Sequence, residues 1–366
     1  MFENIPKNWK KDKLENISSV NYGTRIVKES STGNEYYVYG GGDKTFKTDT
    51  YNRENTLIVA RFGMSPKCTR FVKGKFFLND SGLTVDTNNN NLLNQDFLNW
   101  QLFFLNDLIY SLGKGVAQKN LNVTLFKKIN IAIPPTLEEQ QEIVDVLDAA
   151  SEIIRLRMAC IESAQSLIPA IFQEMFGDPI NNDKNLPKEK IGKIFTLTSG
   201  KFIPSKELDS NGQYPVYGGN GINGYHNEFL FEDSKICIGR VGVKCGCIHR
   251  TEPHSWITDN ALYINNYLIP INETYLKEAL TQINLNQYAK RAAQPVISQT
   301  TICNQYLLLP PEDQQELFAA KVQEIEAYIK IQQAELEKAQ TMFNSLLHHA
   351  FTGKLTENIT FEVENE

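Results

Sequence analysis

Two stretches of the sequence repeat apolar side chains at steps that alternate between four and three residues. The first stretch spans residues 143–175, and the second follows 175 residues later. Such steps place the side chains on one face of a long helix that packs against another helix. We call these two faces the seams. They comprise Ile143, Leu147, Ala150, Ile154, Arg157, Ile161, Ala164, Ile168, Ile171 and Met175 in the first helix, and Phe318, Val322, Ile325, Ile329, Gln332, Leu336, Ala339, Phe343, Leu346 and Ala350 in the second.

The same short motif precedes both seams. Residues 133–142 read Ile-Pro-Pro-Thr-Leu-Glu-Glu-Gln-Gln-Glu, and residues 309–316 read Leu-Pro-Pro-Glu-Asp-Gln-Gln-Glu. Proline in the first turn, with acidic side chains near the positive end of the helix dipole, is typical of a helix start. We therefore predict that a long helix begins in each motif. Pro169 lies inside the first helix, off its seam, and predicts a kink or an early end there.

The segments outside the helices also form a repeat, which indicates one ancestral unit used twice. The matching segments are residues 14–17 and 191–194, 36–41 and 214–219, 57–63 and 236–242, 77–83 and 256–262, and 115–118 and 291–294. Short apolar runs bounded by Gly and Asn predict strands at residues 57–60, 75–78, 235–238 and 262–264. Helices are predicted at residues 97–112 and 275–291. The expected order is an α/β unit, a long helix, a second α/β unit and a second long helix.

Composition agrees with two globular units. The chain has 366 residues, 41% of them hydrophobic, which is enough for two cores of ordinary size. The sequence contains no apolar signal region and no run of membrane-spanning length, so we expect a cytoplasmic protein without membrane contact. Six cysteines are too few for a disulfide framework in a chain of this length, which agrees with a reducing compartment.

The net charge of −6 conceals a segregation of charge along the chain. Residues 1–133 carry 18 Lys/Arg and 12 Asp/Glu, and residues 179–309 carry 13 and 11. By contrast, residues 134–178 carry 2 and 9, and the remainder from residue 310 carries 4 and 11. The globular parts are therefore basic and the helices acidic. This leaves the globular parts free to face a polyanion while the helices face another partner.

The order of these parts resembles the DNA-specificity (S) subunit of Type I restriction-modification systems. The resemblance rests on the two Pro-Pro helix starts and on the run His-His-Ala-Phe-Thr-Gly-Lys-Leu at residues 348–355. A looser version of that run, Ile-Phe-Gln-Glu-Met-Phe-Gly-Asp, closes the first helix at residues 171–178. The resemblance covers nearly the whole chain except its last ten or so residues.

The resemblance implies a non-catalytic reader of DNA with an α/β fold. Two similar target recognition domains would each read one half of a split sequence, with two long antiparallel helices as a coiled-coil spacer of approximate two-fold symmetry. The implied parts are recognition domains at residues 1–133 and 179–309, spacer helices at 134–178 and 310–355, and a tail at 356–366. The implied partners are double-stranded DNA and two modification subunits, which methylate adenine with S-adenosylmethionine. Restriction subunits, with ATP and magnesium, can join, and this chain itself would need no cofactor.

Candidate DNA contacts are Lys, Arg, Asn and Tyr residues near glycines, where the backbone can approach phosphates or bases. They are Tyr39, Lys44, Arg61, Lys67, Arg70, Lys114 and Lys119 in the first domain, and Tyr217, Asn220, Arg240, Lys244, Arg250, Lys290 and Arg291 in the second. Arg61 and Arg240 occupy matching places, which favours phosphate positioning or a structural role over base reading. We expect base readers where the copies differ, as in residues 67–70 against residues 246–249. Many surface Lys and Arg side chains are simply solvated.

The seams also allow expectations about the spacer. At about 1.5 Å per residue the first seam is roughly 48 Å long. With a duplex rise of ~3.4 Å per base pair, the two half-sites would be separated by at most about 14 base pairs.

A polar residue in a seam commonly fixes helix register, so we expect a structural role for Arg157 and Gln332 rather than contact with DNA. Apolar residues outside the seams must be covered by the recognition domains or by a partner subunit. These are Val144, Ile153, Leu156, Tyr328, Ile331 and Leu347.

Three other motifs have simpler explanations. Residues 219–224 fit the Gly-x-Gly-x-x-Gly dinucleotide fingerprint, but no predicted helix follows to hold a pyrophosphate. Zinc ligands are conceivable among Cys237, Cys245, Cys247, His249 and His254, yet Cys-x-Cys is not the usual spacing, and we expect no metal site. The pair His348-His349 suits the negative end of a helix dipole, so a capping role suffices.

No catalytic constellation is recognisable. The Pro-Pro pairs begin helices rather than an amino-methyltransferase motif, and there is no P-loop and no persuasive nuclease cluster. Two alternatives stay open from the residues alone. One is a coiled-coil scaffold that binds no nucleic acid, and the other is an enzyme with a degenerate site.

Overall fold

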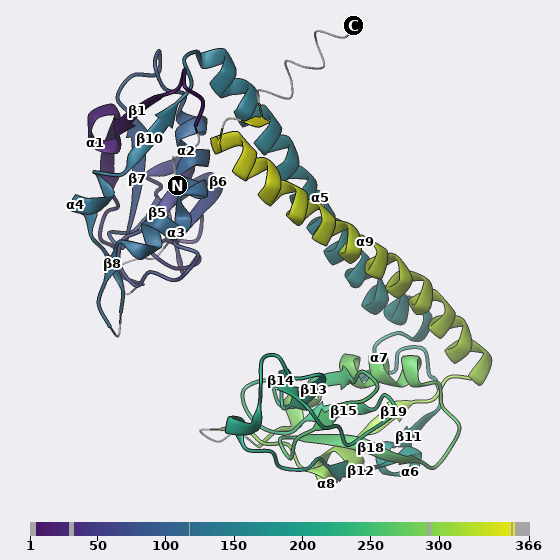
Figure 1. Cartoon of the computed structure of the whole chain (residues 1–366). Coiled ribbons are helices and arrows are strands. Elements are labelled where there is room, and N and C mark those ends of the chain that lie inside the picture. The colour runs from purple at the N-terminus through teal and green to yellow at the C-terminus, as the bar shows by residue number, and fades with distance from the viewer. Residues whose placement is uncertain (1–4, 29–32, 117, 291–293, 353, 356–366) are drawn as a thin grey trace, which may run out of the picture. The chain divides into compact units, whose positions relative to one another are not determined.

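The computed structural model describes residues 5–28, 33–116, 118–290, 294–352 and 354–355. The predicted Arg291 contact and the predicted tail at 356–366 lie outside these residues. Contacts divide the chain into a first unit, Met1–Arg157 with Glu335–Glu366, and a second unit, Met158–Ala334. Each unit joins one globular domain to part of both long helices (Figure 1). The predicted order of domain, helix, domain and helix is confirmed.

The first domain is built on a six-stranded sheet. Its strands, in spatial order, are β2 (Ser18–Tyr22), β7 (Gly82–Thr87), β5 (Arg53–Ala60), β6 (Thr69–Leu78), β3 (Tyr36–Tyr39) and β4 (Lys47–Thr48). All neighbours are antiparallel except β3 and β6. Two antiparallel pairs lie outside this sheet, β1 (Lys10–Lys13) with β10 (Asn130–Ile133) and β8 (Gly113–Lys114) with β9 (Asn120–Leu121). The helices are α1 (Leu14–Ile17), α2 (Gln95–Phe104), α3 (Asn106–Ser111) and α4 (Val123–Phe126).

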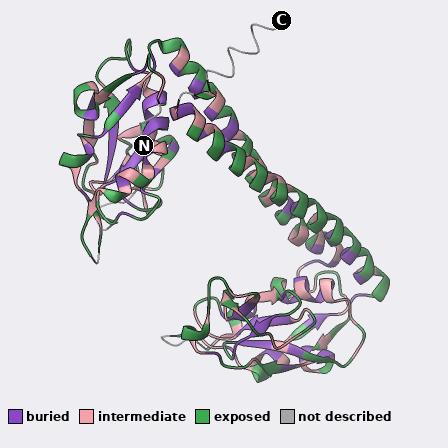
Figure 2. Ribbon diagram, viewed as in Figure 1, coloured by how far each residue is buried: buried purple, intermediate pink, exposed green. Residues whose placement is uncertain are grey.

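Strand β5 explains why this sheet holds the domain together. Its last four residues are all buried, and successive side chains point to opposite faces of the sheet. Leu57 and Val59 join the main core with α2, whereas Ile58 joins a smaller cluster on the other side. A continuous apolar run buried on both faces is the pattern of a central strand. Figure 2 shows the buried residues gathered inside each domain.

The second domain repeats this arrangement in two smaller sheets. The four-stranded sheet has the order β12 (Phe195–Ser199), β18 (Ala261–Tyr267), β15 (Ile236–Gly239) and β16 (Ile248–Arg250). The three-stranded sheet has the order β14 (Gly221–His226), β13 (Tyr214–Gly218) and β17 (Trp256–Ile257). Strand β11 (Lys188–Lys190) pairs with β19 (Tyr306–Leu308). The helices are α6 (Ile191–Ile194), η2 (Ser205–Glu207), α7 (Glu273–Ile283), η3 (Leu285–Tyr288) and α8 (Gln299–Cys303).

The strand pairings show that the two domains share one topology. The parallel pair β3 and β6 has its counterpart in the parallel pair β13 and β17. Strand β6 is continuous, whereas its counterpart is divided into β16 and β17 by residues 251–255, where His254 has φ 53. The predicted strands fall in β5, β6, β15 and β18.

Both predicted helices of the domains are broken. Helix α2 ends at Phe104 and α3 begins at Asn106, so residues 97–112 do not form one helix. In the second domain α7 ends at Ile283, because Asn284 is left-handed at φ 53, and the short helix η3 follows. Asn adopts this conformation more readily than most residues, which makes it a natural helix end.

The long helices are α5 (Leu137–Phe176) and α9 (Glu312–Thr352). Of the two outcomes predicted at Pro169, the early end is wrong, because α5 continues through this residue, and the kink stays a prediction. In the first unit, Ile143 and Leu147 near the start of α5 share a core with Phe343 and Ala350 near the end of α9. In the second unit the end of α5 packs against the start of α9, with Phe172, Phe176, Phe318 and Val322 in one core. The two helices therefore pack antiparallel, as predicted (Figure 1).

Every residue of both seams is buried or half-buried. Of the apolar residues outside the seams, Val144 and Leu347 lie in the core of the first unit. The other four, Ile153, Leu156, Tyr328 and Ile331, stay exposed, between 43% and 61%. Within the described ranges, no helix combines the length and the apolar character that crossing a bilayer requires.

Candidate nucleic-acid interface

In the first domain several loops meet at Arg61, the residue directly after β5. The backbone N–H of Arg61 donates to the Ser81 carbonyl at 2.8 Å, and the Arg61 carbonyl accepts from the N–H of Leu121 at 2.8 Å. These bonds tie the loop after β5 to the loop before β7 and to β9. The guanidinium of Arg61 lies over the rings of Tyr22 and Phe62, with centroids at 4.7 and 4.3 Å. We call this meeting of loops the arginine crossing.

Glycine allows these loops to approach so closely. A Cβ atom on Gly41 would lie 2.1 Å from the carbonyl oxygen of Phe62, closer than any side chain tolerates. Gly63, two residues after Arg61, has φ +60, which favours glycine. The repeat segments at residues 36–41 and 57–63 therefore meet in the arginine crossing.

The second domain contains the same crossing around Arg240. Its N–H donates to the Asn260 carbonyl at 3.0 Å, and its carbonyl accepts from the N–H of Ile297 at 2.9 Å. A Cβ atom on Gly239 would lie 1.9 Å from the Gly219 carbonyl oxygen. The Nη1 atom of Arg240 lies 3.5 Å from the Ser199 hydroxyl, on the strand that corresponds to the strand of Tyr22.

The two crossing arginines carry uncompensated charge. Among the described residues, no carboxylate lies within ion-pair distance of Arg61 or Arg240. Of the other arginines among the predicted contacts, the two that the structure describes are paired: Arg70 lies 3.8 Å from Asp43, and Arg250 lies 3.1 Å from Glu273. Arg61 and Arg240 are both half-buried, so each guanidinium is held in place and still reaches solvent. Such a group can bind a phosphate with little loss of side-chain freedom.

Several of the lysines predicted to contact DNA lie on the loops of the two arginine crossings. The Lys119 carbonyl accepts from the N–H of Met64, and its ammonium lies 3.9 Å from the Tyr110 ring centroid. Lys114 is next to it on the β8–β9 hairpin. In the second domain, Lys290 and Val241 both form bridges with Val296, which brings Lys290 beside the segment after Arg240. The remaining exposed candidates are Lys44, Lys67, Asn220 and Lys244.

Of the two tyrosines predicted to contact DNA, Tyr217 belongs to the core of its domain, and Tyr39 is half-buried against a smaller core cluster. Tyr217 is 5% exposed, and its hydroxyl accepts a hydrogen bond from the N–H of Glu252 at 3.1 Å. Burial raises the pKa of Tyr217 above its ordinary value. Tyr39 is half-buried and packs its ring edge-on against Phe76, with centroids 5.4 Å apart. Both side chains occupy the second residue of a parallel strand pair, where packing explains them.

The segments expected to read bases differ structurally as well as in sequence. In the first domain, Asn106 accepts hydrogen bonds from the N–H groups of Cys68 and Thr69, which fixes this segment against α3. Lys67 is exposed beside it. In the second domain, burial lowers the pKa of His249, which favours the neutral ring. The first domain therefore presents a lysine in this segment and the second domain a neutral histidine, and these side chains offer different hydrogen-bonding groups.

The other motifs take structural roles. Residues 219–224 run into strand β14 of a hairpin, so no helix start is available for a pyrophosphate. Cys237 is fully buried in a central strand, and burial raises its thiol pKa to about 12. Over the described ranges, no three His, Cys, Asp or Glu side chains are grouped to hold a metal. His349 lies in the last turn of α9, as a capping role requires.

Sequence reasoning missed the aromatic residues beside Arg61. Tyr22, on β2, and Phe62, in the loop after β5, hold the guanidinium between their rings. Both residues stand directly before a glycine, Gly23 and Gly63, and that position is the only sequence signal that points to them.

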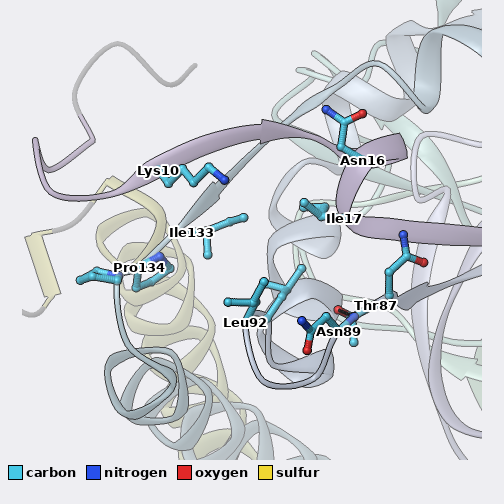
Figure 3. Close-up of a pocket in the computed structure, with 11 residues that line it drawn as sticks. Lys10, Asn16, Ile17, Thr87, Asn89, Leu92, Ile133 and Pro134 are labelled. Carbon is cyan, nitrogen blue, oxygen red and sulfur yellow. Dashed lines mark hydrogen bonds between the residues drawn. The ribbon is translucent and has the colours of Figure 1, made fainter.

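A pocket of about 240 Å³ lies elsewhere in the first unit, where β1 and β10 meet the start of α5 (Figure 3). None of the predicted DNA contacts lines it.

Comparison with known proteins agrees with this picture. A family model described as Type I restriction modification DNA specificity domain matches residues 6–163 and again residues 184–341. The EcoprrI specificity subunit of Escherichia coli is 30% identical over 138 residues, 36% of this chain and 34% of that protein. A putative type I specificity subunit of Mycoplasma pneumoniae is 24% identical over 314 residues, 81% of this chain and 83% of the relative.

The fold is also found in a solved structure. The S subunit of a Type I restriction-modification system from M. genitalium superposes with a TM-score of 0.61 at 21% identity. The match covers 95% of this chain and 97% of that one. Because the two family matches together span well over half of the sequence, the chain belongs to the Type I restriction modification DNA specificity domain family.

Proposed function

We propose that the chain is the DNA-recognition subunit of a Type I restriction-modification complex and reads a two-part target. Each globular domain contacts one half-site, and the chain itself performs no chemistry. The observation that carries this proposal is the arginine crossing, which occurs once in each domain with an arginine that no described carboxylate neutralises. Two copies of one DNA-contacting unit suit a target that consists of two separate half-sites.

In this proposal Arg61 and Arg240 bind phosphates and place each domain on the duplex. The same crossing serves two domains whose other loops differ, and phosphate contacts carry no sequence information. Lysines on the neighbouring loops add charge, namely Lys44, Lys67, Lys114, Lys119, Lys244 and Lys290. Base reading falls to residues 67–70 and 246–249, together with Asn220. The predicted contact at Arg291 remains a prediction.

The helices take the role of spacer and docking surface. Their acidic charge suits contact with protein better than contact with DNA. Ile153, Leu156, Tyr328 and Ile331 leave an apolar surface that two modification subunits would cover. Those subunits would bring S-adenosylmethionine, and restriction subunits would bring ATP and magnesium. We expect the assembly to act in the cytoplasm, where it meets the chromosome and incoming DNA.

A gel-shift experiment with the partner subunits at stated salt tests this proposal. The complete complex should bind a duplex that carries both half-sites far more tightly than the modification subunits alone do. Scrambling either half-site should remove most of this gain, about 10³-fold or more, as for other specific DNA-binding proteins. Equal binding with and without this chain would favour the scaffold alternative. Methylation by the isolated chain would favour an enzyme.

A further inference from the structure

A buried glutamine joins the first domain to the helix that follows it. Gln140, on the first turns of α5, is 1% exposed. Its Oε1 atom accepts from the backbone N–H of Asn94 at 2.7 Å, and its Nε2 atom donates to the carbonyls of Leu92 at 3.1 Å and Pro134 at 3.3 Å. The next residue, Gln141, accepts from the Asn94 side-chain amide at 2.8 Å. We call this set of bonds a glutamine clasp.

The second domain has the same clasp. Gln315, on the first turn of α9, is 5% exposed. Its Oε1 atom accepts from the N–H of Asn272 at 3.0 Å, and its Nε2 atom donates to the Pro310 carbonyl at 2.9 Å. The next residue, Glu316, accepts from the Asn272 side-chain amide at 2.9 Å. Three of the four bonds of the first clasp recur atom for atom in the second, so the clasp is a feature of the repeated unit.

Each clasp contacts a helix of the recognition domain at the asparagine that caps the start of that helix. The Oδ1 atom of Asn94 accepts from the N–H groups of Asp96 and Phe97 and thereby caps α2. Asn272 caps α7 in the same way. Helix α2 packs against the central sheet in the main core of its domain, so the orientation of α2 defines the orientation of the whole domain. Through the cap, each glutamine links the orientation of a whole domain to the start of a spacer helix.

The apolar contacts around the clasp do not fix this orientation by themselves. Domain and helices share one apolar core in the first unit, but apolar contact is not directional. Two hollows lie along the contact between the first domain and α5 or the residues just before it. One is the pocket of about 240 Å³ lined by Leu92 and Pro134 (Figure 3), and the other is a groove of about 510 Å³ lined by Trp100 and Asp148. Outside the clasp, the indole N–H groups of Trp9 and Trp100 donate to Glu139 and Asp148 of α5, both at 2.8 Å. The buried Gln140 adds a directional contact that apolar packing lacks, because tilting the domain would leave its side chain unpaired.

We infer that Gln140 and Gln315 are positioning residues that fix the angle of each recognition domain on its spacer helix, and thereby set which gap between half-sites the protein accepts. This inference rests on the proposed function. Adding one base pair moves a half-site by about 3.4 Å and rotates it by about 35°. Helix length sets the distance between the domains, but only a fixed domain angle can reject a half-site that is rotated.

The test uses the full complex with its partner subunits and a series of duplexes. The half-sites stay constant, and the gap between them varies by one and two base pairs in each direction. The variants are Q140M and Q315M, alone and together, because methionine keeps the length of glutamine and removes its hydrogen bonds. Q314M is the matched control. Gln314 is adjacent in the same helix turn, and its side-chain amide makes no hydrogen bond within the described structure.

The native complex and Q314M should lose at least about 100-fold in affinity when the gap changes by one base pair, comparable with a mismatched position. The double variant should lose less than about 10-fold, and each single variant an intermediate amount. The cost of a base change within a half-site should be unaltered. A gap profile as narrow as the native one, or an equal loss at all gaps, would overturn the inference.

Two further outcomes are separable. If Q140M, Q315M and the double variant all fail to assemble while Q314M assembles, Gln140 and Gln315 are needed for folding rather than for positioning, and the inference is wrong. If the native complex shows no preference for any sequence or gap, the proposed function itself fails.

Discussion

The Nη2 atom of Arg157 on α5 lies 3.6 Å from the Oε2 atom of Glu335 on α9. The one polar residue in the first seam therefore faces an acidic residue of the other long helix. The Lys338 ammonium, through a hydrogen bond, and to a lesser degree Arg157 hold the pKa of Glu335 below its ordinary value. Both Arg157 and Glu335 are about one-third exposed, so this ion pair aligns the helices more than it stabilises them.

Replacing Arg157 with leucine should therefore be tolerated. We expect the free energy of unfolding to change by less than about 1 kcal/mol, because a partly exposed ion pair contributes little and leucine continues the apolar seam. Thermal unfolding of the complex measures this change. DNA affinity should also be unaltered. A tenfold loss of affinity at unaltered stability would mean that Arg157 touches DNA.

Replacing Arg61 or Arg240 with alanine should weaken binding to every DNA sequence by a similar factor. A phosphate contact contributes affinity without sequence preference, so the slope of log affinity against log salt should fall by about 1 for each variant. Titrations at several salt concentrations measure the slope. R155A is the control, because Arg155 is paired with Glu152 on α5. If R61A instead relaxes the base preference at one position, this arginine reads a base.

The aromatic residues at the helix ends should be required for stability. Phe351, in the closing motif of α9, lies 5.5 Å from Phe97 and 5.2 Å from Phe104 of the first domain, measured between ring centroids. F351A should cost about 3–5 kcal/mol, as for other buried Phe to Ala changes. Chemical denaturation measures this cost, with exposed Met342 changed to alanine as the control. A cost below about 1 kcal/mol would show that the end of α9 is not part of the domain core.

Sequence periodicity predicted the features that repeat over many residues. The seams at Ile143 and Val322 follow from a pattern that only packed helices satisfy, and the two domains follow from matched segments. Features that depend on one contact between distant residues were not predictable. Nothing in the sequence indicates that Gln140 contacts Asn94, although Gln140 and Gln315 both belong to the repeated helix-start motif.

The tyrosines show why the candidate site was only partly predictable. Tyr39 and Tyr217 stand beside glycines and look suited to DNA contact, yet the parallel pairing of their strands turns both toward a core. Pairing between distant strands decides which face a residue occupies, and a single sequence does not reveal it. Arg61 and Arg240 occupy matching places in the two domains, as predicted, and their contact with DNA stays a prediction. The rings of Tyr22 and Phe62, which hold Arg61, become visible only in the fold.

Lengthening both long helices together tests the spacer. Inserting seven residues into each keeps the seam in phase and adds about 10 Å, which corresponds to about three base pairs. Replacing the same seven residues without insertion is the control. We expect the gap in the recognised sequence to grow by this amount while both half-sites stay the same. An unaltered gap would mean that helix length does not set the distance.

The most direct test of two-part recognition is a genome-wide map of modified adenines by single-molecule sequencing, from cells with and without this gene. The account predicts a methylated motif that depends on the gene and consists of two short specific parts separated by a fixed number of unread bases. It also predicts that R61A weakens methylation without changing the motif. A contiguous motif, or a methylation pattern that does not depend on the gene, would contradict it.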